Sequence, residues 1–330
     1  NKESNVKKRI VSAVSLAVFG AVAVSVAQMP GGGMGGGMGF GGMGGGMGFG
    51  GMGGGRTPQV VGEPAPVPKS VAIPRPTAQE VDAMNAELKK FIQNNTSASK
   101  DLLKEYADLI SVVPPRNNPC VRPTSGGVRQ GRHDAFVEIA NSQEFDVLFH
   151  GDSITDWWQQ PAEQGGGTAV FEKHFGDMKV ANFAVAGDTT QGLLWGLQNG
   201  EGQGHKPKVV MLMIGTNSAG SSTGAEIAEG VGAVVLELQK NFPDAKILLL
   251  AIFPRGASNE DRMRQTNEEA NKIIAKLADD KKVFFMNIND KFLNAQGGLI
   301  GFRGDNLHPN EEGYEIWAQA VKPMIEKLLK

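Results

Sequence analysis

Four short segments of the sequence contain the residue types that acyl transfer requires. Their candidate reactive residues are Ser153, Gly187, Asn217 and, near the C-terminus, the pair Asp305 and His308. A serine hydroxyl can attack a carbonyl carbon when a histidine takes its proton and a carboxylate orients that histidine. Asp305 precedes His308 by three residues, so both fit within one turn of chain. The backbone N–H groups of Ser153 and Gly187 and the Asn217 amide would then stabilise the oxyanion.

The first three segments each follow an apolar run with strand character, and segments of helical periodicity separate these runs. This alternation predicts βαβ units, a parallel five-stranded sheet and helices on both of its faces. The five runs are 145–149, 180–185, 209–214, 247–253 and 283–288. Because ligands bind beyond the carboxyl ends of such strands, we expect the segments to meet at that edge. One segment alone would indicate a cap or a turn, whereas their joint occurrence indicates a single site.

The blocks GDSIT, AVAGDTT, IGTNS and DNLH resemble the four sequence blocks of the GDSL/SGNH hydrolase superfamily. The resemblance covers residues 133–330 and is greatest, within that superfamily, to the catalytic subunits of platelet-activating-factor acetylhydrolase. It implies a flavodoxin-like three-layer α/β/α sandwich in which Ser153, His308 and Asp305 are catalytic and Ser153, Gly187 and Asn217 form the oxyanion hole. The implied activity is hydrolysis of a short ester, most simply an acetyl ester, without a metal or a cofactor.

Several residues beside these blocks are open to two interpretations. Trp157, Trp158 and Thr189 are candidates for the wall of a substrate pocket, although one of the two tryptophans is expected in the core. Asp152 is interpreted as structural, bonding loop amides rather than reacting. His150 stands where relatives usually carry an aliphatic residue, and it is expected to perturb the strand end or the surroundings of the serine.

The N-terminal residues have the pattern of an export signal. Lys7, Lys8 and Arg9 precede an apolar run over 10–27, and small residues lie before the expected cleavage after Ala27. Residues 1–27 are therefore predicted to be the signal peptide of an exported protein, periplasmic or extracellular. The run is also long enough for an uncleaved membrane anchor, which remains the alternative.

Residues 28–76 form a predicted disordered linker that is rich first in Gly and Met and then in Pro. The stretch 31–55 contains only Gly, Met and Phe, which cannot bury enough apolar surface to fold. It indicates a flexible tether or a segment for surface association or self-association. Thr77 and Glu80 form a capping-box pattern, so 77–132 is predicted as a helical preface and loop before a hydrolase domain at 133–330.

The composition excludes several classes of protein. The chain has 33 Lys+Arg and 35 Asp+Glu residues and a formal net charge of −2, and so balanced a chain is not expected to bind nucleic acid. Cys120 is the single cysteine, which excludes an intrachain disulfide and a Cys-based zinc cage. It is expected to lie in a loop without a functional role or, if exposed, to cross-link two copies of the chain. A homodimer is left open.

The hypothesis that these patterns favour is a serine esterase that removes acetyl groups from small-molecule or polysaccharide esters outside the cell. One alternative is a lysophospholipase or thioesterase that acts on longer acyl chains of lipids. The other is a carbohydrate-binding surface protein without catalytic activity, which uses the Gly/Met-rich segment for attachment. The complete set of blocks argues against a protein that has lost catalysis.

Overall fold

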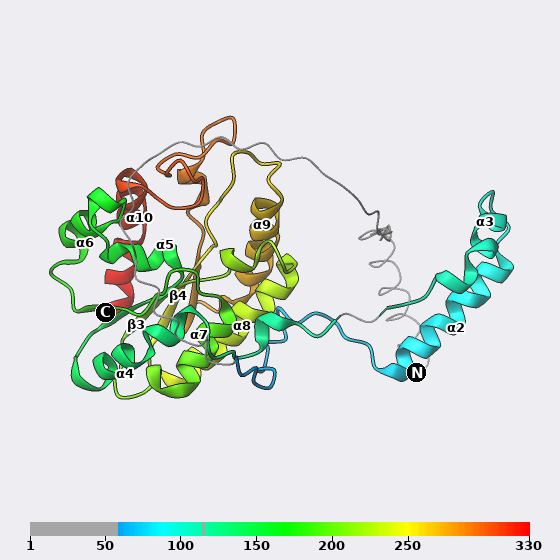
Figure 1. The fold of residues 1–330 in the computed structure, drawn as a ribbon, viewed down its shortest axis with the longest axis horizontal. Coiled ribbons are helices and arrows are strands. Elements are labelled where there is room, and N and C mark those ends of the chain that lie inside the picture. Colours follow the sequence, from blue (N-terminus) through cyan, green and yellow to red (C-terminus); the bar gives the residue numbers. More distant parts are fainter. Residues whose placement is uncertain (1–58, 114–115) are drawn as a thin grey trace, which may run out of the picture. The chain divides into compact units, whose positions relative to one another are not determined.

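The computed structural model describes residues 59–113 and 116–330. The predicted signal peptide, the Gly/Met-rich stretch and the start of the linker therefore lie outside the described residues. The described chain divides into two compact units, one of residues 75–113 and one that combines 59–74 with 116–330 (Figure 1). No helix in these ranges combines the length and the apolar character needed to cross a membrane.

The smaller unit is helical and starts at the predicted cap. Helix α2 (Ala78–Asn94) begins after Thr77, whose side chain accepts from the Glu80 N–H while the Glu80 carboxylate accepts from the Thr77 N–H. The capping box predicted from the sequence is thus confirmed. Helix α3 (Lys100–Glu105) and a 3₁₀ turn, η1 (Ala107–Leu109), follow. The Asn85 side chain accepts a hydrogen bond from the Val112 N–H at 2.7 Å and holds the end of this unit against α2.

The larger unit is built on a parallel five-stranded sheet with the strand order β2-β1-β3-β4-β5. The strands are β1 (Val147–Gly151), β2 (Val180–Asn182), β3 (Val209–Met213), β4 (Lys246–Leu250) and β5 (Val283–Met286). Val147 of β1 pairs with Val180 of β2 and with Val209 of β3. The predicted parallel sheet is confirmed, although most strands end earlier than the apolar runs because the last apolar residues already belong to the buried turns beyond the sheet.

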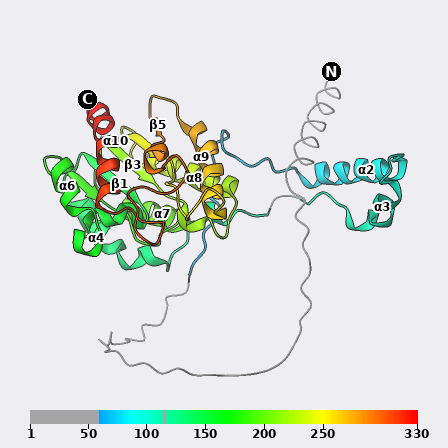
Figure 2. The same cartoon turned by 90° about the horizontal axis from the view of Figure 1, so that it is seen from above.

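Helices cover both faces of this sheet and make the predicted three-layer sandwich (Figures 1 and 2). One face packs against α4 (His133–Ser142), α7 (Thr190–Gly196), α8 (Gly224–Asn241) and α9 (Arg262–Ile274). The other packs against α5 (Ser153–Asp156), α6 (Thr168–Phe175) and α10 (Glu311–Leu329). Short helical turns join these elements: η2 (Pro119–Val121), η3 (Val128–Gly131), η4 (Trp157–Gln159), η5 (Ala162–Gln164), η6 (Leu197–Glu201), η7 (Thr216–Ser218), η8 (Ala275–Leu277) and η9 (Asn289–Phe292).

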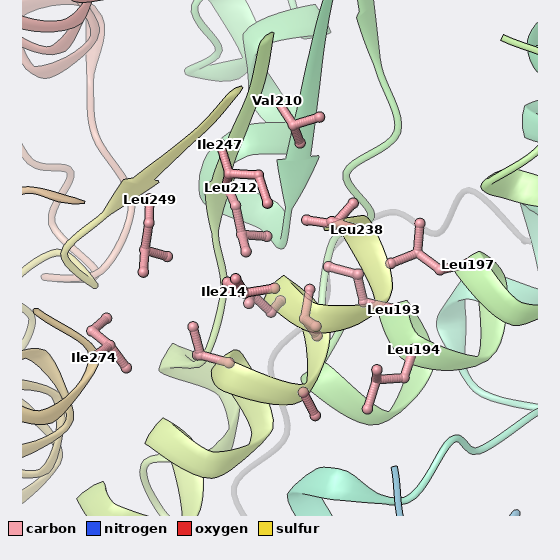
Figure 3. Packing of buried hydrophobic residues seen from close by; sticks show 14 of the residues in the cluster. Leu193, Leu194, Leu197, Val210, Leu212, Ile214, Leu238, Ile247, Leu249 and Ile274 are labelled. Carbon is pink, nitrogen blue, oxygen red and sulfur yellow. The ribbon is translucent and has the colours of Figure 1, made fainter. Parts of the chain in front are cut away.

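Side chains alternate between the two faces along each strand, as the pleat requires. Leu212 of β3 and Leu249 of β4 belong to the core between the sheet and α7, α8 and α9, and Leu194 and Ile274 are members of the same cluster (Figure 3). Met211, between Val210 and Leu212, contributes instead to the core on the α10 face. Because both faces are covered, the strands are apolar throughout, which is why the sequence shows continuous apolar runs.

The unit that carries the sheet is larger than the predicted domain of residues 133–330. Residues 59–74 and 116–132 fold with it. Gly62 and Ala65 donate backbone hydrogen bonds of 2.7 Å to Pro123 and Val121, so the two segments run side by side. The sequence does not reveal this association because it joins two Pro-rich stretches that lack strand or helix periodicity.

Cys120 belongs to this added part and is fully buried in the core beneath α8. Its surroundings raise the pKa of the thiol, chiefly through burial. The expectation that an exposed Cys120 could cross-link copies is therefore wrong.

Candidate active site

The candidate residues gather where the order of the strands reverses. The chain passes from β1 outward to β2 and then back across β1 to β3. A crevice forms at such a point because the connections on either side leave in opposite directions. Ser153 follows β1, Gly187 follows β2 and Asn217 follows β3, so three of the four segments emerge on the two sides of this crevice.

Ser153, His308 and Asp305 form a continuous chain of hydrogen bonds. The Ser153 Oγ lies 2.9 Å from the His308 Nε2, and the His308 Nδ1 lies 2.8 Å from an Asp305 carboxylate oxygen. The imidazole is therefore in contact with a hydroxyl at one nitrogen and with a carboxylate at the other. With Nδ1 protonated and bonded to Asp305, the Nε2 lone pair is directed at the hydroxyl, as a general base requires.

A tight turn before α10 fixes Asp305 and His308 relative to one another. The other Asp305 oxygen accepts from the backbone N–H groups of Leu307 and His308, at 2.9 and 3.0 Å. Asn306 has a φ of 54°, a left-handed conformation that Asn tolerates better than most residues. Partial burial raises the pKa of Asp305, but the hydrogen bonds from His308 and Leu307 outweigh it and hold this pKa below its ordinary value. Asp305 is thus held as a carboxylate that orients the ring.

The turn from β1 into α5 that carries Ser153, which we call the nucleophile turn, is held by contacts from several elements. A Cβ on Gly151 would lie 2.3 Å from the Met213 carbonyl oxygen, so only glycine allows β1 and β3 to approach this closely. Asp152 caps α5 by accepting from the Ile154 N–H at 3.1 Å, consistent with the structural role predicted for it. The Tyr314 hydroxyl of α10 donates to the Ile154 carbonyl at 2.9 Å. Ser153 is therefore fixed as the first residue of a helical turn.

Gly187 and Asn217 lie on the loops that follow β2 and β3. Gly187 has a φ of 80°, a conformation that favours glycine, and its N–H donates no hydrogen bond within the described residues. The Asn217 amide donates to the Asp188 carbonyl at 2.8 Å, and its second N–H has no partner within the described residues. This bond ties the two loops together, which fixes two of the three predicted oxyanion donors relative to each other.

A buried ionic cluster that the sequence did not indicate supports these loops. Arg129 is 1% exposed, and it donates to the Asp188 carboxylate at 2.7 Å and to the Glu201 carboxylate at 2.5 Å. His133 contacts the second Glu201 oxygen at 2.9 Å. Asp188 follows Gly187 directly, and its carbonyl oxygen accepts from the Asn217 amide. By holding the Asp188 carboxylate, Arg129 therefore positions the two loops after β2 and β3 that carry predicted oxyanion donors, which we call the oxyanion loops. Asp188 lies within the AVAGDTT block, but nothing in the sequence signals that residues 129 and 188 meet.

The three predicted pocket residues have different surroundings. Trp157 is half-buried and stacks on His308. Trp158 is 1% exposed and packs against Tyr314 and Trp317, so it is not available to a substrate. Its assignment to a pocket wall is corrected because α10 covers it. Thr189 lines a cavity of about 430 Å³ together with Gly187 and Asp188.

His150 is completely buried in β1, and neither ring nitrogen has a hydrogen-bond partner among residues 59–113 and 116–330. Burial lowers its pKa well below the ordinary value, and the charges of Arg129 and His205 act in the same direction. The neutral ring therefore fills a core position as an aliphatic side chain would. Within residues 59–113 and 116–330, no group of three or more His, Cys, Asp or Glu side chains is placed to hold a metal ion.

A hydrogen-bonded Ser–His–Asp chain at the carboxyl edge of a parallel sheet is the arrangement found in serine hydrolases. A model of the GDSL-like lipase/acylhydrolase family matches residues 149–316. The chain therefore belongs to the GDSL-like lipase/acylhydrolase family and is a hydrolase of ester bonds.

Two relatives have similar sequences over the same region. The platelet-activating factor acetylhydrolase IB subunit alpha2 of Rattus norvegicus is 32% identical over 222 residues, which cover 65% of this chain and 92% of the relative. The alpha1 subunit from the same organism is 29% identical over 220 residues, covering 64% of this chain and 91% of the relative.

The chain is also similar to proteins of solved structure. A GDSL-like lipase from Bacteroides thetaiotaomicron is 19% identical with a TM-score of 0.49, over 60% of this chain and 97% of that one. A carbohydrate acetylesterase from Sinorhizobium meliloti is 21% identical with a TM-score of 0.45, over 56% of this chain and 100% of that one.

Proposed function

We propose that this chain is a serine esterase that hydrolyses short acyl esters, with acetyl as the preferred acyl group. The observation that carries the proposal is the chain of hydrogen bonds from the Ser153 Oγ through His308 to Asp305. The names of the two relatives, both acetylhydrolases, support acetyl as the acyl group.

The geometry suits a two-step mechanism. The Ser153 Oγ attacks the ester carbonyl carbon while the His308 Nε2 takes the hydroxyl proton. The carbonyl oxygen becomes an oxyanion that accepts from the N–H groups of Ser153 and Gly187 and from the Asn217 amide. When the C–O bond to the alcohol breaks, His308 returns the proton to the departing oxygen and an acyl-serine remains.

Water completes the reaction along the same path. His308 takes a proton from the water as its oxygen attacks the acyl carbon, and the same donors hold the second oxyanion. Collapse of this intermediate breaks the bond to Ser153, whose oxygen recovers its proton from His308. The carboxylic acid leaves, and the hydroxyl, the imidazole and the Asp305 carboxylate are again in their starting forms.

We further propose that the natural ester belongs to a carbohydrate or a similar substrate outside the cell. The export-signal pattern of residues 1–27 supports this location. A second candidate function, hydrolysis of longer acyl chains of lipids, is favoured by the breadth of the family, whose description covers lipases as well as acylhydrolases.

The test compares the purified wild-type chain with the Ser153→Ala variant on p-nitrophenyl acetate, butyrate and octanoate, and on acetylated xylan. We expect Ser153→Ala to lower kcat by about 10⁴-fold or more, activity to decrease with chain length, and acetate to be released from the polymer. Ser142→Ala, which changes an exposed serine at the end of α4, is the matched control and should keep full activity.

Other outcomes decide between the alternatives. A preference for octanoate would replace the proposal by a lipid-type acyl hydrolase. Equal turnover by the wild type and Ser153→Ala would exclude the mechanism. Binding of xylan without any turnover would favour a carbohydrate-binding surface protein.

A further inference from the structure

The cavity beside Gly187 has walls that come from outside the residues matched to the family. Gly187, Asp188, Thr189 and Gln191 form one side. The lining residues that precede the matched range of 149–316 are Gln59, Val61, Pro119, Arg122, Thr124, Gly127 and Val128. Its volume of about 430 Å³ lies within the range of about 300–1,000 Å³ typical of small-molecule sites.

Backbone pairing holds these outer walls in place. Val61 and Thr124 form an antiparallel bridge, and Ser125 donates to the Val60 carbonyl at 3.1 Å. Thr124 donates to the Gln191 carbonyl of α7 at 3.0 Å. The wall is therefore attached to the helix that begins just after the oxyanion loop.

The cavity adjoins the candidate active site through the loop after β2. The Val185 N–H donates to the Gly151 carbonyl at 3.2 Å, and the Ala186 N–H donates to an Asp156 carboxylate oxygen at 2.9 Å. These bonds place the loop that ends in Gly187 against the nucleophile turn. Gly187 thus belongs both to the cavity lining and to the loop that lies against the nucleophile turn.

The lining combines apolar surface with polar side chains and carries one positive charge, that of Arg122. The Arg122 guanidinium forms no ion pair within the described residues, and its single hydrogen bond there, to the Gly62 carbonyl, is long at 3.5 Å. Asp188 is the one acidic residue of the lining, and Arg129 already neutralises it. Gln59, Thr124 and Gln191 add amide and hydroxyl groups.

The Arg122 guanidinium is the feature of this lining that favours an anionic ligand. An acyl chain in the cavity would contact its apolar surface but would gain nothing from the Arg122 guanidinium or from the side-chain amides. A carboxylate or phosphate would instead pair with Arg122 through charge-assisted hydrogen bonds.

We propose that this cavity is a subsite for the alcohol part of the ester and that Arg122 recognises an anionic group on it, as in an O-acetylated acidic sugar. The subsite rests on the proposed esterase function, because it selects among esters that Ser153 hydrolyses. It makes Arg122 a specificity-determining residue at a position that the family match does not include.

The test uses matched pairs of substrates that differ in charge. The first pair is a mono-acetylated methyl galacturonoside and the corresponding neutral methyl galactoside. The second pair is 1-acetylglycerol 3-phosphate and monoacetylglycerol. For Arg122→Gln we expect kcat/KM to fall about tenfold on the acetylated galacturonoside and to change by less than about twofold on both neutral esters.

The pattern of loss identifies the source of the anion. A loss confined to the galacturonoside assigns the subsite to acidic sugars, whereas an equal or greater loss on the glycerol phosphate would replace the sugar by a phosphate headgroup. Arg122→Lys should recover part of the activity because it keeps the charge. Lys272→Gln, an exposed charge change on α9, is the control and should leave all four rates unchanged.

Failure of the subsite and failure of the esterase function can be told apart. Ser153-dependent turnover of the neutral esters with no charge-selective effect of Arg122→Gln would overturn the subsite alone. Absence of Ser153-dependent turnover on every ester would overturn the esterase function. A calorimetric titration of Ser153→Ala with methyl galacturonoside adds a readout without turnover, and it should show binding that Arg122→Gln weakens.

Discussion

Trp157 lies nearly flat against His308, with ring centroids 3.9 Å apart and ring planes inclined by 25°. The Arg303 guanidinium also lies over the Trp157 ring, 5.1 Å from its centroid. Trp157, four residues after Ser153, thus contacts both Arg303 and His308 from the segment before α10, and its stacking restricts rotation of the imidazole. Trp157 is therefore a positioning residue for His308 as well as a candidate for contact with the substrate.

The two roles of Trp157 make different kinetic predictions. Because a stacked aromatic pair contributes about 0.5–1.5 kcal/mol, Trp157→Ala should lower kcat on p-nitrophenyl acetate by about fivefold through misplacement of His308. Trp157→Phe keeps a stacking ring and should retain most of kcat. A change in KM with an unaltered kcat would assign Trp157 to substrate contact instead.

Removal of the Asn217 amide should lower kcat strongly, because this amide is one of the predicted oxyanion donors. Loss of one oxyanion donor typically lowers kcat by about 10²–10³-fold, and we expect a loss of this size for Asn217→Ala in steady-state assays of a short ester. Asn199→Ala removes an exposed amide that donates to the Trp195 carbonyl and serves as the control. Full activity of Asn217→Ala would exclude this side chain from the oxyanion hole.

The ionic cluster around Arg129 predicts a large effect on stability. Arg129→Gln would leave the Asp188 and Glu201 carboxylates buried without their counter-ion, and such changes destabilise a protein by about 3–5 kcal/mol. Arg132→Gln breaks a more exposed ion pair, at 3.3 Å from Asp156, and should cost less than about 1 kcal/mol. Urea denaturation of both variants measures the difference, and equal midpoints would contradict the importance of the cluster.

Burial of His150 predicts a gain in stability when the ring is replaced. His150→Leu removes two buried nitrogen atoms that have no partner in the described part of the chain and should raise the free energy of unfolding by about 1 kcal/mol. The gain should grow at acid pH. Unfolded chains protonate this histidine below a pH of about 6.5, whereas its lowered pKa keeps it neutral in the folded protein.

The prediction for His150 is tested by measuring how the free energy of unfolding changes with pH. In the wild type this histidine makes stability fall as the pH drops below about 6.5, because the unfolded state binds more protons than the folded state. Thermal denaturation of wild type and His150→Leu between pH 5 and 8 should show a shallower acid slope in the variant. Identical slopes would mean that the ring is protonated when folded.

The raised pKa of Asp152 predicts that the free energy of unfolding falls as the pH rises, which is opposite in sign to the effect of His150. Burial, more than any other effect, raises the pKa of Asp152 to about 7, so the folded protein keeps a proton that unfolded chains lose above a pH of about 4. This residue therefore lowers stability as the pH rises from about 4 to about 7. Asp152→Asn keeps an oxygen for the Ile154 N–H and should remove that decline in denaturation measured across this range. A decline as steep as that of the wild type would contradict a protonated Asp152.

Local patterns in the sequence determined the elements of the fold and the chemistry of its candidate residues. The alternation of apolar runs and helical segments depends on short-range periodicity, so it predicted the parallel sheet and both helical layers. The Thr77 cap was equally visible, because its hydrogen bonds join residues three positions apart. The blocks around Ser153 and His308 could likewise be read from residue type and from their place after the strands.

Tertiary structure alone decided the contacts between distant segments. The Arg129–Asp188 pair, the burial of Trp158 beneath α10 and the cavity wall at Val61 each join residues far apart in the chain. No short-range pattern records such contacts, because each depends on how whole elements pack and not on the spacing of neighbouring residues. The sequence thus determined which groups are able to react, and the packing decided which of them meet and what surrounds them.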